Sequence, residues 1–319
     1  PVPQLSYPPM IHTLPLTSTT LHGHFSSALP PILTVDSGDT IRCQTIDAGW
    51  NVRDQPQPLV QRVKFTPHDR ERDPGHALIG PIAIRGAEPG MTLEVRLNTI
   101  RPGPWGWTSA GGFPSFVNQA LGLDTGDEIY LSWKIAEKTA TNQFGQTISI
   151  RPFLGILGMP PPDTSQRHST VPPRPWGGNI DCKELIGGSR VFLPIPVSGG
   201  LFSLGDGHAV QGDGEVANPA LECPMDEVEV ELHLHPELHL SMPRAETPAG
   251  RITFGFDEDL NAALVQALSG MLDWMQELYG VERNHALALA TTVVDLHVTQ
   301  VANGVKGVHA ILPDGAVRQ

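Results

Sequence analysis

Residues 228–234 read Val228-Glu229-Val230-Glu231-Leu232-His233-Leu234, an alternation of apolar and polar side chains that is the clearest fold signal in the chain. Successive side chains of a strand point to opposite faces of a sheet, so this period of two predicts a strand with one buried face. Residues 29–46 and 79–97 each read as strand, turn and strand, with Gly-containing turns at 36–39 and 88–90. The sequence therefore predicts many short strands joined by tight turns.

Composition supports this prediction. The 319 residues include 33 Gly and 31 Pro, and 39% of the chain is hydrophobic. The Gly and Pro clusters separate apolar segments and follow no fixed period, which favours strands and turns over disorder. A chain of this length can bury a substantial core.

One helix stands out near the C-terminus. Apolar residues recur at helical spacing from Leu260 to Leu278, Asp257 or Asp259 can cap the start, and Gly280 can end it. We expect a weaker helix at 282–294 and strands at 296–301 and 307–312. The predicted fold is mainly β and sandwich-like, α+β overall. Its β-rich region, 1–245, is expected to carry the chemistry, and a helix-plus-strand part, 246–319, to pack on it as one structural unit.

The charge balance limits the partners. With 34 acidic and 21 basic residues the net charge is −13, which repels nucleic acid and anionic membranes. No apolar run is long enough for a membrane span, and residues 1–10 show no secretory signal. Three cysteines, Cys43, Cys182 and Cys223, form no CxxC pair, so we expect no disulfides and a cytoplasmic location.

A proline-rich segment lies in mid-chain. Residues 159–179 contain six prolines, so we expect an irregular loop, and loops of this length often have a function. It leads directly into a polar motif, so we expect it to shape the site. An inert excursion or a contact between subunits is the alternative.

The richest polar segment combines glycines with three carboxylates, an imidazole and an amide: Gly205-Asp206-Gly207-His208-Ala209-Val210-Gln211-Gly212-Asp213-Gly214-Glu215. It lacks the Lys-Ser/Thr of a phosphate-binding loop and the ligand spacing of an EF-hand. Asp206 and His208 lie two residues apart and face the same way on an extended segment, an arrangement that suits a metal. A Gly-rich turn with solvated acids is the alternative.

A second motif, residues 177–184, places Asn179, Asp181 and Lys183 on one face of an extended segment and Cys182 on the other. That separation weighs against a Cys nucleophile assisted by Lys183, and we expect Cys182 to be a small buried residue. The sequence also lacks a GxSxG elbow and a Ser-Ser-Lys signature. A hydrolytic role would therefore require a metal-activated water.

Other histidines are weaker candidates. His233 and His235 have the spacing of a two-ligand zinc strand, but glutamates continue the same face, so we expect a solvated surface. We expect structural roles for six isolated histidines: His12, His68, His168, His285, His297 and His309.

Longer stretches extend these motifs along the chain. The central ones are Gly178-Asn179-Ile180-Asp181-Cys182-Lys183-Glu184-Leu185, Leu193-Pro194, Leu201-Phe202-Ser203-Leu204-Gly205-Asp206-Gly207-His208 and Gln211-Gly212-Asp213-Gly214-Glu215. The N-terminal ones are Leu21-His22-Gly23-His24-Phe25, Leu29-Pro30-Pro31, Val35-Asp36-Ser37-Gly38-Asp39, Gly75-His76, Gly80-Pro81-Ile82 and Gly86-Ala87-Glu88-Pro89-Gly90. A C-terminal stretch begins at Lys306-Gly307-Val308-His309-Ala310. In this order they resemble the acetamidase/formamidase family over nearly the whole chain.

The resemblance implies a β-rich, sandwich-like fold and a metal-dependent hydrolase that converts small linear amides to carboxylate and ammonia. On the matching positions, the candidate metal ligands are His22, Asp36, Asp181, Asp206 and His208. Glu215 is the candidate general base, and Lys183 either stabilises the oxyanion or pairs with a carboxylate. Asn179 and Gln211 are candidate substrate-binding residues. Zinc suits a mixed His/Asp set, with calcium or manganese as alternatives.

Two alternatives to this function stay open. One is a hydrolase of another C–N substrate, ureido, guanidino or aryl-acetamide, whose pocket would be lined by Trp105, Trp107 and Phe113. The other is a non-catalytic β-sandwich that contains a metal and binds a small ligand. A homo-oligomer, dimer or larger, is expected in either case.

Overall fold

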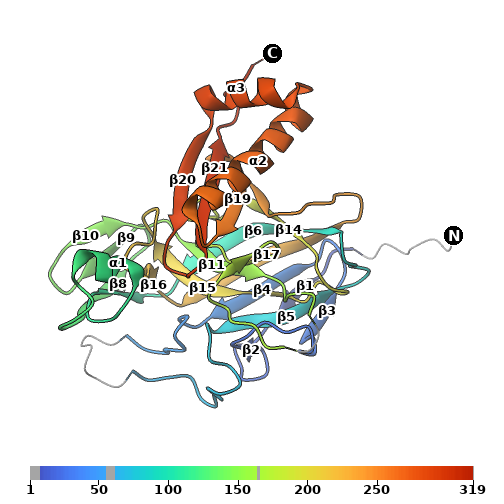
Figure 1. The fold of residues 1–319 in the computed structure, drawn as a ribbon. Helices are drawn as coiled ribbons and strands as arrows, with labels where there is room; N and C mark the ends of the chain where they lie inside the picture. Colours follow the sequence, from blue (N-terminus) through green and yellow to red (C-terminus); the bar gives the residue numbers. More distant parts are fainter. Residues whose placement is uncertain (1–7, 55–61, 164–165, 319) are drawn as a thin grey trace.

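Two large β-sheets form the body of the protein (Figure 1). The computed structural model describes residues 8–54, 62–163 and 166–318. Within them, the nine-stranded sheet runs in the order β1 (Ile11–Thr13), β4 (Thr40–Thr45), β17 (Met225–His235), β6 (Thr92–Pro102), β14 (Arg190–Pro194), β18 (Arg244–Thr247), β19 (Gly250–Asp257), β21 (Lys306–Leu312) and β20 (Asp295–Gln300).

The second sheet has twelve strands in the described residues. Its main path is β10 (Thr147–Ser149), β9 (Thr139–Asn142), β8 (Ile129–Ile135), β7 (Trp105–Ala110), β16 (Leu221–Glu222), β15 (Phe202–Val210), β11 (Phe153–Gly158), β13 (Gly177–Asn179) and β12 (Pro173–Arg174). Off this path, β5 (Leu78–Ile84) pairs with β15, β2 (Leu21–His22) and β3 (Leu33–Val35).

The alternating stretch forms β17 as predicted. Val228, Val230 and Leu232 are fully buried, whereas Glu229 and Glu231 are half-buried. The main core cluster joins such residues of the nine-stranded sheet to buried residues of the other sheet, among them Leu154 and Phe202. Fully burying a large apolar side chain contributes about 1.5–3 kcal/mol, so this shared core is what holds the two sheets together. The predicted mainly β, sandwich-like fold is confirmed.

The two predicted strand–turn–strand segments are connections between the sheets rather than hairpins. β3 pairs with β5 in one sheet, whereas β4, just after the turn, lies between β1 and β17 in the other. In the same way β5 and β6 belong to different sheets. Local turn chemistry predicts that the chain reverses, but not which partner the next strand finds.

The C-terminal helices agree with the prediction. α2 (Leu260–Tyr279) begins after Asp259, whose side chain accepts from the amide of Asn261, and ends at Gly280 in the left-handed conformation. α3 (Arg283–Val293) follows, and both helices stand on one side of the body beside β19–β21 (Figure 1). No described helix has the length and apolar character needed to cross a bilayer. β18, which contains residue 245, lies inside the nine-stranded sheet, so the sheet continues across the expected regional boundary.

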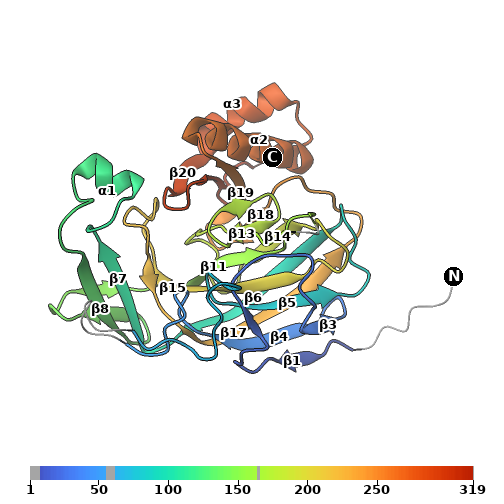
Figure 2. The same cartoon turned by 60° about the horizontal axis from the view of Figure 1, so that its bottom comes forward.

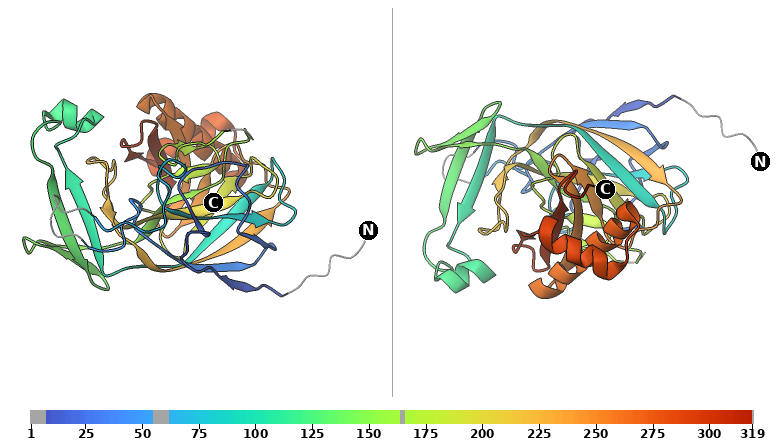
Figure 3. Two further views of the ribbon diagram at one scale, coloured as in Figure 1. Left: turned by 90° about the horizontal axis from the view of Figure 1, so that it is seen from below. Right: turned by 90° about the horizontal axis from the view of Figure 1, so that it is seen from above.

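A β arm projects from the other end of the molecule (Figures 2 and 3). It contains β7, β8 and between them α1 (Phe116–Leu121), which is capped by Ser115 and ended by Gly122. This helix was not predicted from the sequence, and it has only six residues. Its apolar side chains Phe116 and Leu121 are exposed and so give no periodic burial signal.

The proline-rich segment is more regular than expected. Residues 164–165 lie outside the described residues, but the rest contains β12 and β13, and β13 extends the sheet by pairing with β11. The prediction of an irregular loop over 159–179 was therefore wrong for its second half. Two glycines of β13, Gly177 and Gly178, have positive φ angles, which is why propensity gave no strand signal there.

Candidate metal and active site

A pocket of about 750 Å³ opens beside the centre of the twelve-stranded sheet. Its inner lining includes Asp206, Glu215, Glu222, Asn179 and Asn303. Several aromatic and cationic side chains also line it: Trp50, Trp107, Phe113, His68, His76, Arg62, Lys64 and Arg70. The pocket is thus lined by buried carboxylates and by aromatic and cationic side chains.

The pairing register of the strands brings the acidic residues of the pocket together. His208 on β15 lies directly opposite Glu222 on the antiparallel strand β16, and their Nε2 and Oε1 atoms are 3.2 Å apart. Asp206, two residues earlier, places Oδ1 3.3 Å from the same nitrogen. Asp181 follows β13, with Oδ1 4.0 Å from His208 Nδ1. Together with Glu215, these residues form what we call the carboxylate cluster: Asp181, Asp206, His208, Glu215 and Glu222.

Three of the cluster residues have a backbone conformation that L-amino acids rarely adopt. The φ angles are 52° at Asp181, 60° at Asp206 and 45° at Glu215. Asp206 consequently interrupts its strand: Leu154 pairs with Gly207 and Ile156 with Gly205, but the ladder omits the pair between them. Such residues cost roughly 1–3 kcal/mol each and concentrate at functional sites.

Gly155 on β11 provides the room for this cluster. A Cβ atom at this position would collide with Asp181 Oδ1 and Asp206 Oδ2, and would lie 2.9 Å from His208 Cε1. Its carbonyl oxygen also accepts from the amides of Ile180 and Asp181, at 2.9 and 3.2 Å. Gly155 therefore both holds the Asp181 turn and leaves a cradle that any side chain would fill.

Several polar atoms of the cluster are buried and have no hydrogen-bond partner within the described residues. They are Asp181 Oδ1, both ring nitrogens of His208, Glu215 Oε2 and Glu222 Oε2. The distances from His208 to its carboxylates are short enough for ion pairs, but the ring N–H directions miss the oxygens. Because an unpaired buried polar group costs roughly 1–3 kcal/mol, this arrangement indicates a missing partner.

The pKa shifts within the cluster also indicate a missing partner. Burial, reinforced by Asp206, raises the pKa of Asp181 to about 7, and burial raises the pKa of Glu222 to about 7. Burial also raises the pKa of Glu215 well above its ordinary value, with Asp181 adding to the effect. At Asp206 burial is outweighed by His208, and the pKa falls to about 2. Four carboxyls crowded around one imidazole thus resist ionising together.

A divalent cation would relieve this repulsion and pair with the free oxygen and nitrogen atoms. Two groups of cluster residues have ligand atoms within 4.8 Å of one another: Asp181, His208 and Glu215, and Asp206, His208 and Glu222. Carboxylates and an imidazole are ligands for zinc and manganese, and oxygen-rich sets suit calcium. The residues present therefore fit a metal ion.

The structure brings together four of the residues proposed from the sequence, Asp181, Asp206, His208 and Glu215. Asn179 lies beside them, lines the pocket and has an unpaired, buried Oδ1. Gln211 is buried nearby but does not line the pocket, and its Nε2 donates to the carbonyl of Asp181 at 2.8 Å.

Three proposed residues lie elsewhere. His22 is buried against Ser203, whose Oγ is 2.9 Å from its Nε2, and its Nδ1 lies 2.8 Å from the carbonyl of His24. Asp36 is exposed and pairs with Arg85 at 2.8 Å. Lys183 pairs with Asp213 at 2.8 Å and does not line the pocket. The structure therefore separates all three side chains from the carboxylate cluster.

Sequence reasoning missed two residues of the site. Glu222 stands between Leu221 and Cys223, and an isolated carboxylate within an apolar stretch was the available signal. Asn303 donates to Asp181 Oδ2 at 2.6 Å from the loop between β20 and β21. Its sequence, Ala302-Asn303-Gly304, looks like ordinary turn chemistry and gave no hint.

The His233–His235 pair joins none of the potential metal groups found in the described residues. His233 lies 3.1 Å from Glu231, and His235 lies 2.6 Å from the buried Glu94. Both rings are partly exposed on β17. Cys182 is fully buried, as expected, and burial raises the pKa of its thiol well above the ordinary value, which disfavours a nucleophile.

Known proteins are similar to this chain in both sequence and fold. The sequence model of the acetamidase/formamidase family matches residues 12–167 and 162–242. A formamidase of Methylophilus methylotrophus is 27% identical over 247 residues, which cover 61% of this chain and 59% of that protein. The chain spans between 50% and 60% of the length of the curated relatives it matches.

Two solved structures superpose over nearly the full length. An acetamidase from Bacillus halodurans has a TM-score of 0.82 and 27% identity, covering 95% of this chain and 97% of its own. An acetamidase from Yersinia enterocolitica also has a TM-score of 0.82, with 25% identity, covering 98% of this chain and 94% of its own. The architecture described above is therefore shared with these proteins.

Proposed function

This chain belongs to the acetamidase/formamidase family, and from that premise we propose that it hydrolyses small linear amides, such as formamide and acetamide, to the carboxylate and ammonia. The observation that carries the proposal is the carboxylate cluster at the base of a pocket, with its buried and unpaired oxygen and nitrogen atoms. A purely structural cluster of this kind would leave costly polar groups unsatisfied.

We propose that Asp206, His208 and Glu222, whose ligand atoms form one group around His208 Nε2, hold a divalent metal, with zinc favoured and calcium or manganese as alternatives. Asp181 faces the other ring nitrogen, Nδ1, and adds a further carboxylate beside this group. When bound, such an ion would polarise the substrate carbonyl and acidify a water molecule. Zinc is favoured because His208 contributes a nitrogen ligand, whereas the oxygen-rich remainder suits the other two ions.

The chain's own side chains would supply orientation and proton transfer. Glu215, in its ionised form, would accept the proton of the attacking water and then deliver it to the leaving nitrogen. Asn179 lines the pocket, and its buried, unpaired Oδ1 would accept from the NH₂ group of the substrate. Gln211 and Asn303 hold the Asp181 turn through its carbonyl and its carboxylate. Lys183 stays with Asp213 and takes no part at the oxyanion.

The size of the pocket favours a second candidate, a larger C–N substrate with an aromatic part. A volume of about 750 Å³ is typical of pockets for drug-sized ligands and far exceeds what formamide fills. Trp107 and Phe113 line it as the sequence suggested, although Trp105 does not, and Trp50 adds a third ring. Arg62 lies over the Trp107 ring, 4.2 Å from its centre, and adds a positive charge to that wall.

An ammonia-release assay over a panel of amides separates these candidates. The panel would contain formamide, acetamide, phenylacetamide and a phenylacetamide with a ring carboxylate, each measured with and without a chelator. Chelator-sensitive turnover of the first two supports the small-amide proposal. A clear preference for the aryl amides replaces it with the larger-substrate candidate.

A binding protein without catalysis would give a different result from either enzyme. It would release no ammonia from any amide, with metal present, while amides still raise its melting temperature. That outcome contradicts the enzyme proposal as a whole.

We also propose that the protein works as a homo-oligomer in the cytoplasm. All three cysteines are buried and free, which suits a reducing compartment. Exposed Phe116 and Leu121 on the β arm are apolar surface of the kind that subunit contacts cover. Sedimentation velocity tests the oligomer: a species larger than the 34.4 kDa chain is expected, and a monomer at all concentrations contradicts it.

A further inference from the structure

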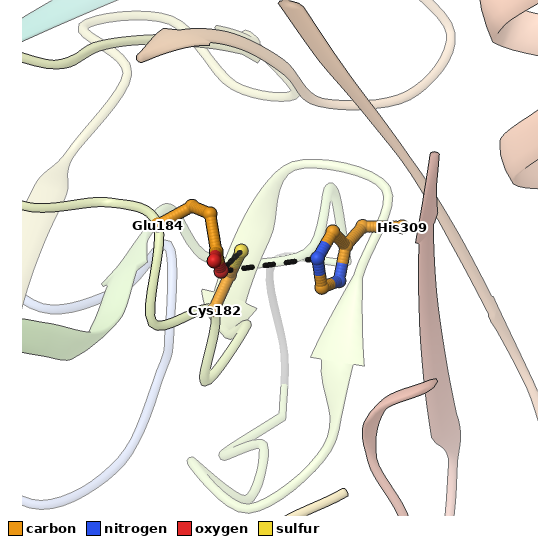
Figure 4. A group of neighbouring side chains, drawn as sticks. All are labelled: Cys182, Glu184 and His309. Carbon is orange, nitrogen blue, oxygen red and sulfur yellow. Dashed lines mark hydrogen bonds and ion pairs between the residues drawn. The ribbon is translucent and has the colours of Figure 1, made fainter. Parts of the chain in front are cut away.

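Among the potential metal ligands outside the carboxylate cluster, Cys182, Glu184 and His309 form a group whose three side chains are all buried. Cys182 and Glu184 occupy the turn after β13, and His309 projects from β21, so two distant parts of the chain meet (Figure 4). All three side chains are buried, and their ligand atoms lie within 4.8 Å of one another. His309 is isolated in the sequence, but β21 carries it to the Cys182 turn.

The separations fit a small tetrahedral ion. Cys182 Sγ and His309 Nε2 each lie 3.8 Å from Glu184 Oε2. Zinc binds thiolate at about 2.3 Å and imidazole or carboxylate at about 2.0–2.1 Å, so neighbouring tetrahedral ligands lie roughly 3.3–3.6 Å apart. The two distances to Glu184 Oε2 exceed this range by only a few tenths of an ångström, and all three ligand atoms lie within 4.8 Å of one another.

His309 gives independent evidence for a ligand. Its Nε2 is buried, points at the group and has no hydrogen-bond partner among the described residues. Its other nitrogen, Nδ1, lies 2.8 Å from Thr299 Oγ1. A ring whose Nδ1–H donates to Thr299 carries its lone pair on Nε2, the orientation that metal-binding histidines show.

The charges around the group do not block a cation. Lys183 is paired with Asp213 at 2.8 Å, and Arg151 lies 3.5 Å from the other oxygen of Glu184. His297 stacks on His309 with ring centres 5.0 Å apart, and it too pairs with Asp213. A thiolate, a carboxylate and a neutral imidazole together balance the charge of a divalent ion.

We propose that Cys182, Glu184 and His309 form a second, structural zinc site that ties the turn after Asp181 to β21. The set of one sulfur, one oxygen and one nitrogen atom suits zinc better than calcium or magnesium. A water or the second carboxylate oxygen fills the fourth position. This site is separate from the proposed amide hydrolysis and is tested separately.

Cobalt distinguishes the two sites, because only this one contains sulfur. Chelated protein is titrated with Co²⁺, a common zinc substitute, while the near-ultraviolet thiolate-to-cobalt absorption band is recorded. Wild-type protein is expected to develop the band and to bind one more cobalt than Cys182→Ser, which lacks it. Cys43→Ser, which changes another buried cysteine outside every potential metal group of the described residues, is the matched control and keeps the band.

His309→Gln serves as the second variant and is expected to weaken cobalt binding at this band by at least tenfold. Circular dichroism confirms that each variant is folded. Absence of the band from cobalt-saturated wild type, or its persistence in Cys182→Ser, overturns the site. Both results are independent of ammonia release, so this proposal and the amidase proposal can fail separately.

Discussion

Single residues in strained conformations assemble the carboxylate cluster. Asp181, Asp206 and Glu215 have positive φ angles, and Gly155 leaves the space that they enclose. The strain and the unpaired polar atoms both cost stability, and they coincide at one place. That coincidence is expected where function, rather than folding, determines which amino acid occupies a position.

Glu215→Gln tests the proton-transfer role. The amide keeps the shape of the side chain but cannot accept the water's proton, so kcat should fall by roughly 10²–10⁴-fold while metal content stays unchanged. Steady-state kinetics and elemental analysis measure the two quantities. Loss of metal would instead identify Glu215 as a ligand, and near-normal turnover with metal retained would leave it a structural residue.

Gly155→Ala tests the cradle. The added methyl group would collide with Asp181 and Asp206, so the variant should lose bound metal and turnover together. Gly212→Ala is the matched control, because a Cβ atom there meets nothing within 4 Å. Equal metal content in the two purified variants would show that the cluster does not use this space.

Residues of the site could be predicted from the sequence only where their neighbours in the chain form a recognisable motif. Asp206 and His208 were found because glycines and polar residues alternate around them, and Asp181 because it lies in a polar motif. Glu222 joins them only through the register of β15 and β16, and Asn303 only through the β20–β21 loop. Asp36 and His22 were proposed from matching motifs, but the structure gives them other partners.

At the scale of elements, Glu94 ties three strands of the nine-stranded sheet together. It lies on β6, where Arg96 donates to it at 2.7 Å, His235 of β17 lies at 2.6 Å and Arg190 of β14 at 3.6 Å. Burial opposes its ionisation, but the hydrogen bonds from Arg96 and His235 outweigh this effect, so the pKa of Glu94 is lowered. The group is therefore ionised in the folded protein at neutral pH.

Glu94→Gln should destabilise the protein in a pH-dependent way. A carboxyl with a lowered folded pKa stabilises the protein above its unfolded pKa, about 4.3, and loses that contribution as pH falls through the folded value. The loss in unfolding free energy should be about 1.5–3 kcal/mol near neutral pH, the range for bonds to charged groups, and should shrink in acid. Urea unfolding across this pH range measures it.

The control for Glu94 is Glu229→Gln, which removes a more exposed pair with Arg42 on the same sheet. Surface pairs contribute about 0–1 kcal/mol, so this variant should change little. A pH-independent difference between Glu94→Gln and wild type would contradict the proposed charge role.

Elements were predictable where one residue pattern determines them. The alternation of β17 and the caps of α2 are local, and both agree with the structure. The sheet to which β4 and β6 belong depends on partners far away in sequence. The short helix α1 and the strand β13 depend on glycine geometry and tertiary contacts rather than on periodicity.

At the scale of the whole molecule, the C-terminal part completes the site rather than merely packing against it. The β20–β21 loop places Asn303 on Asp181, and β20 meets the Glu215 loop, where the Gly214 amide donates to the Thr299 carbonyl at 3.0 Å. Residues more than 120 positions apart in sequence therefore depend on one another for the site geometry.

Asn303→Ala tests this dependence. Removing the donor to Asp181 should lower metal affinity and turnover by roughly 10–100-fold, as changes to residues that orient metal ligands usually do. Asn98→Ala is the control. It removes an exposed hydrogen bond from the Asn98 side-chain amide to Glu231, and it should leave metal affinity and turnover unchanged. Metal titrations that agree for Asn303→Ala and wild type would show that the C-terminal part has no role at the site.

Metal-dependent amide hydrolysis is tested by the rate of ammonia release from acetamide by chelator-treated protein as zinc is added back. We predict negligible release from protein that elemental analysis shows to be metal-free, and a rate that rises with added zinc until the carboxylate cluster is filled. Undiminished release by the metal-free protein would show that this cluster is not a metal-dependent amidase site.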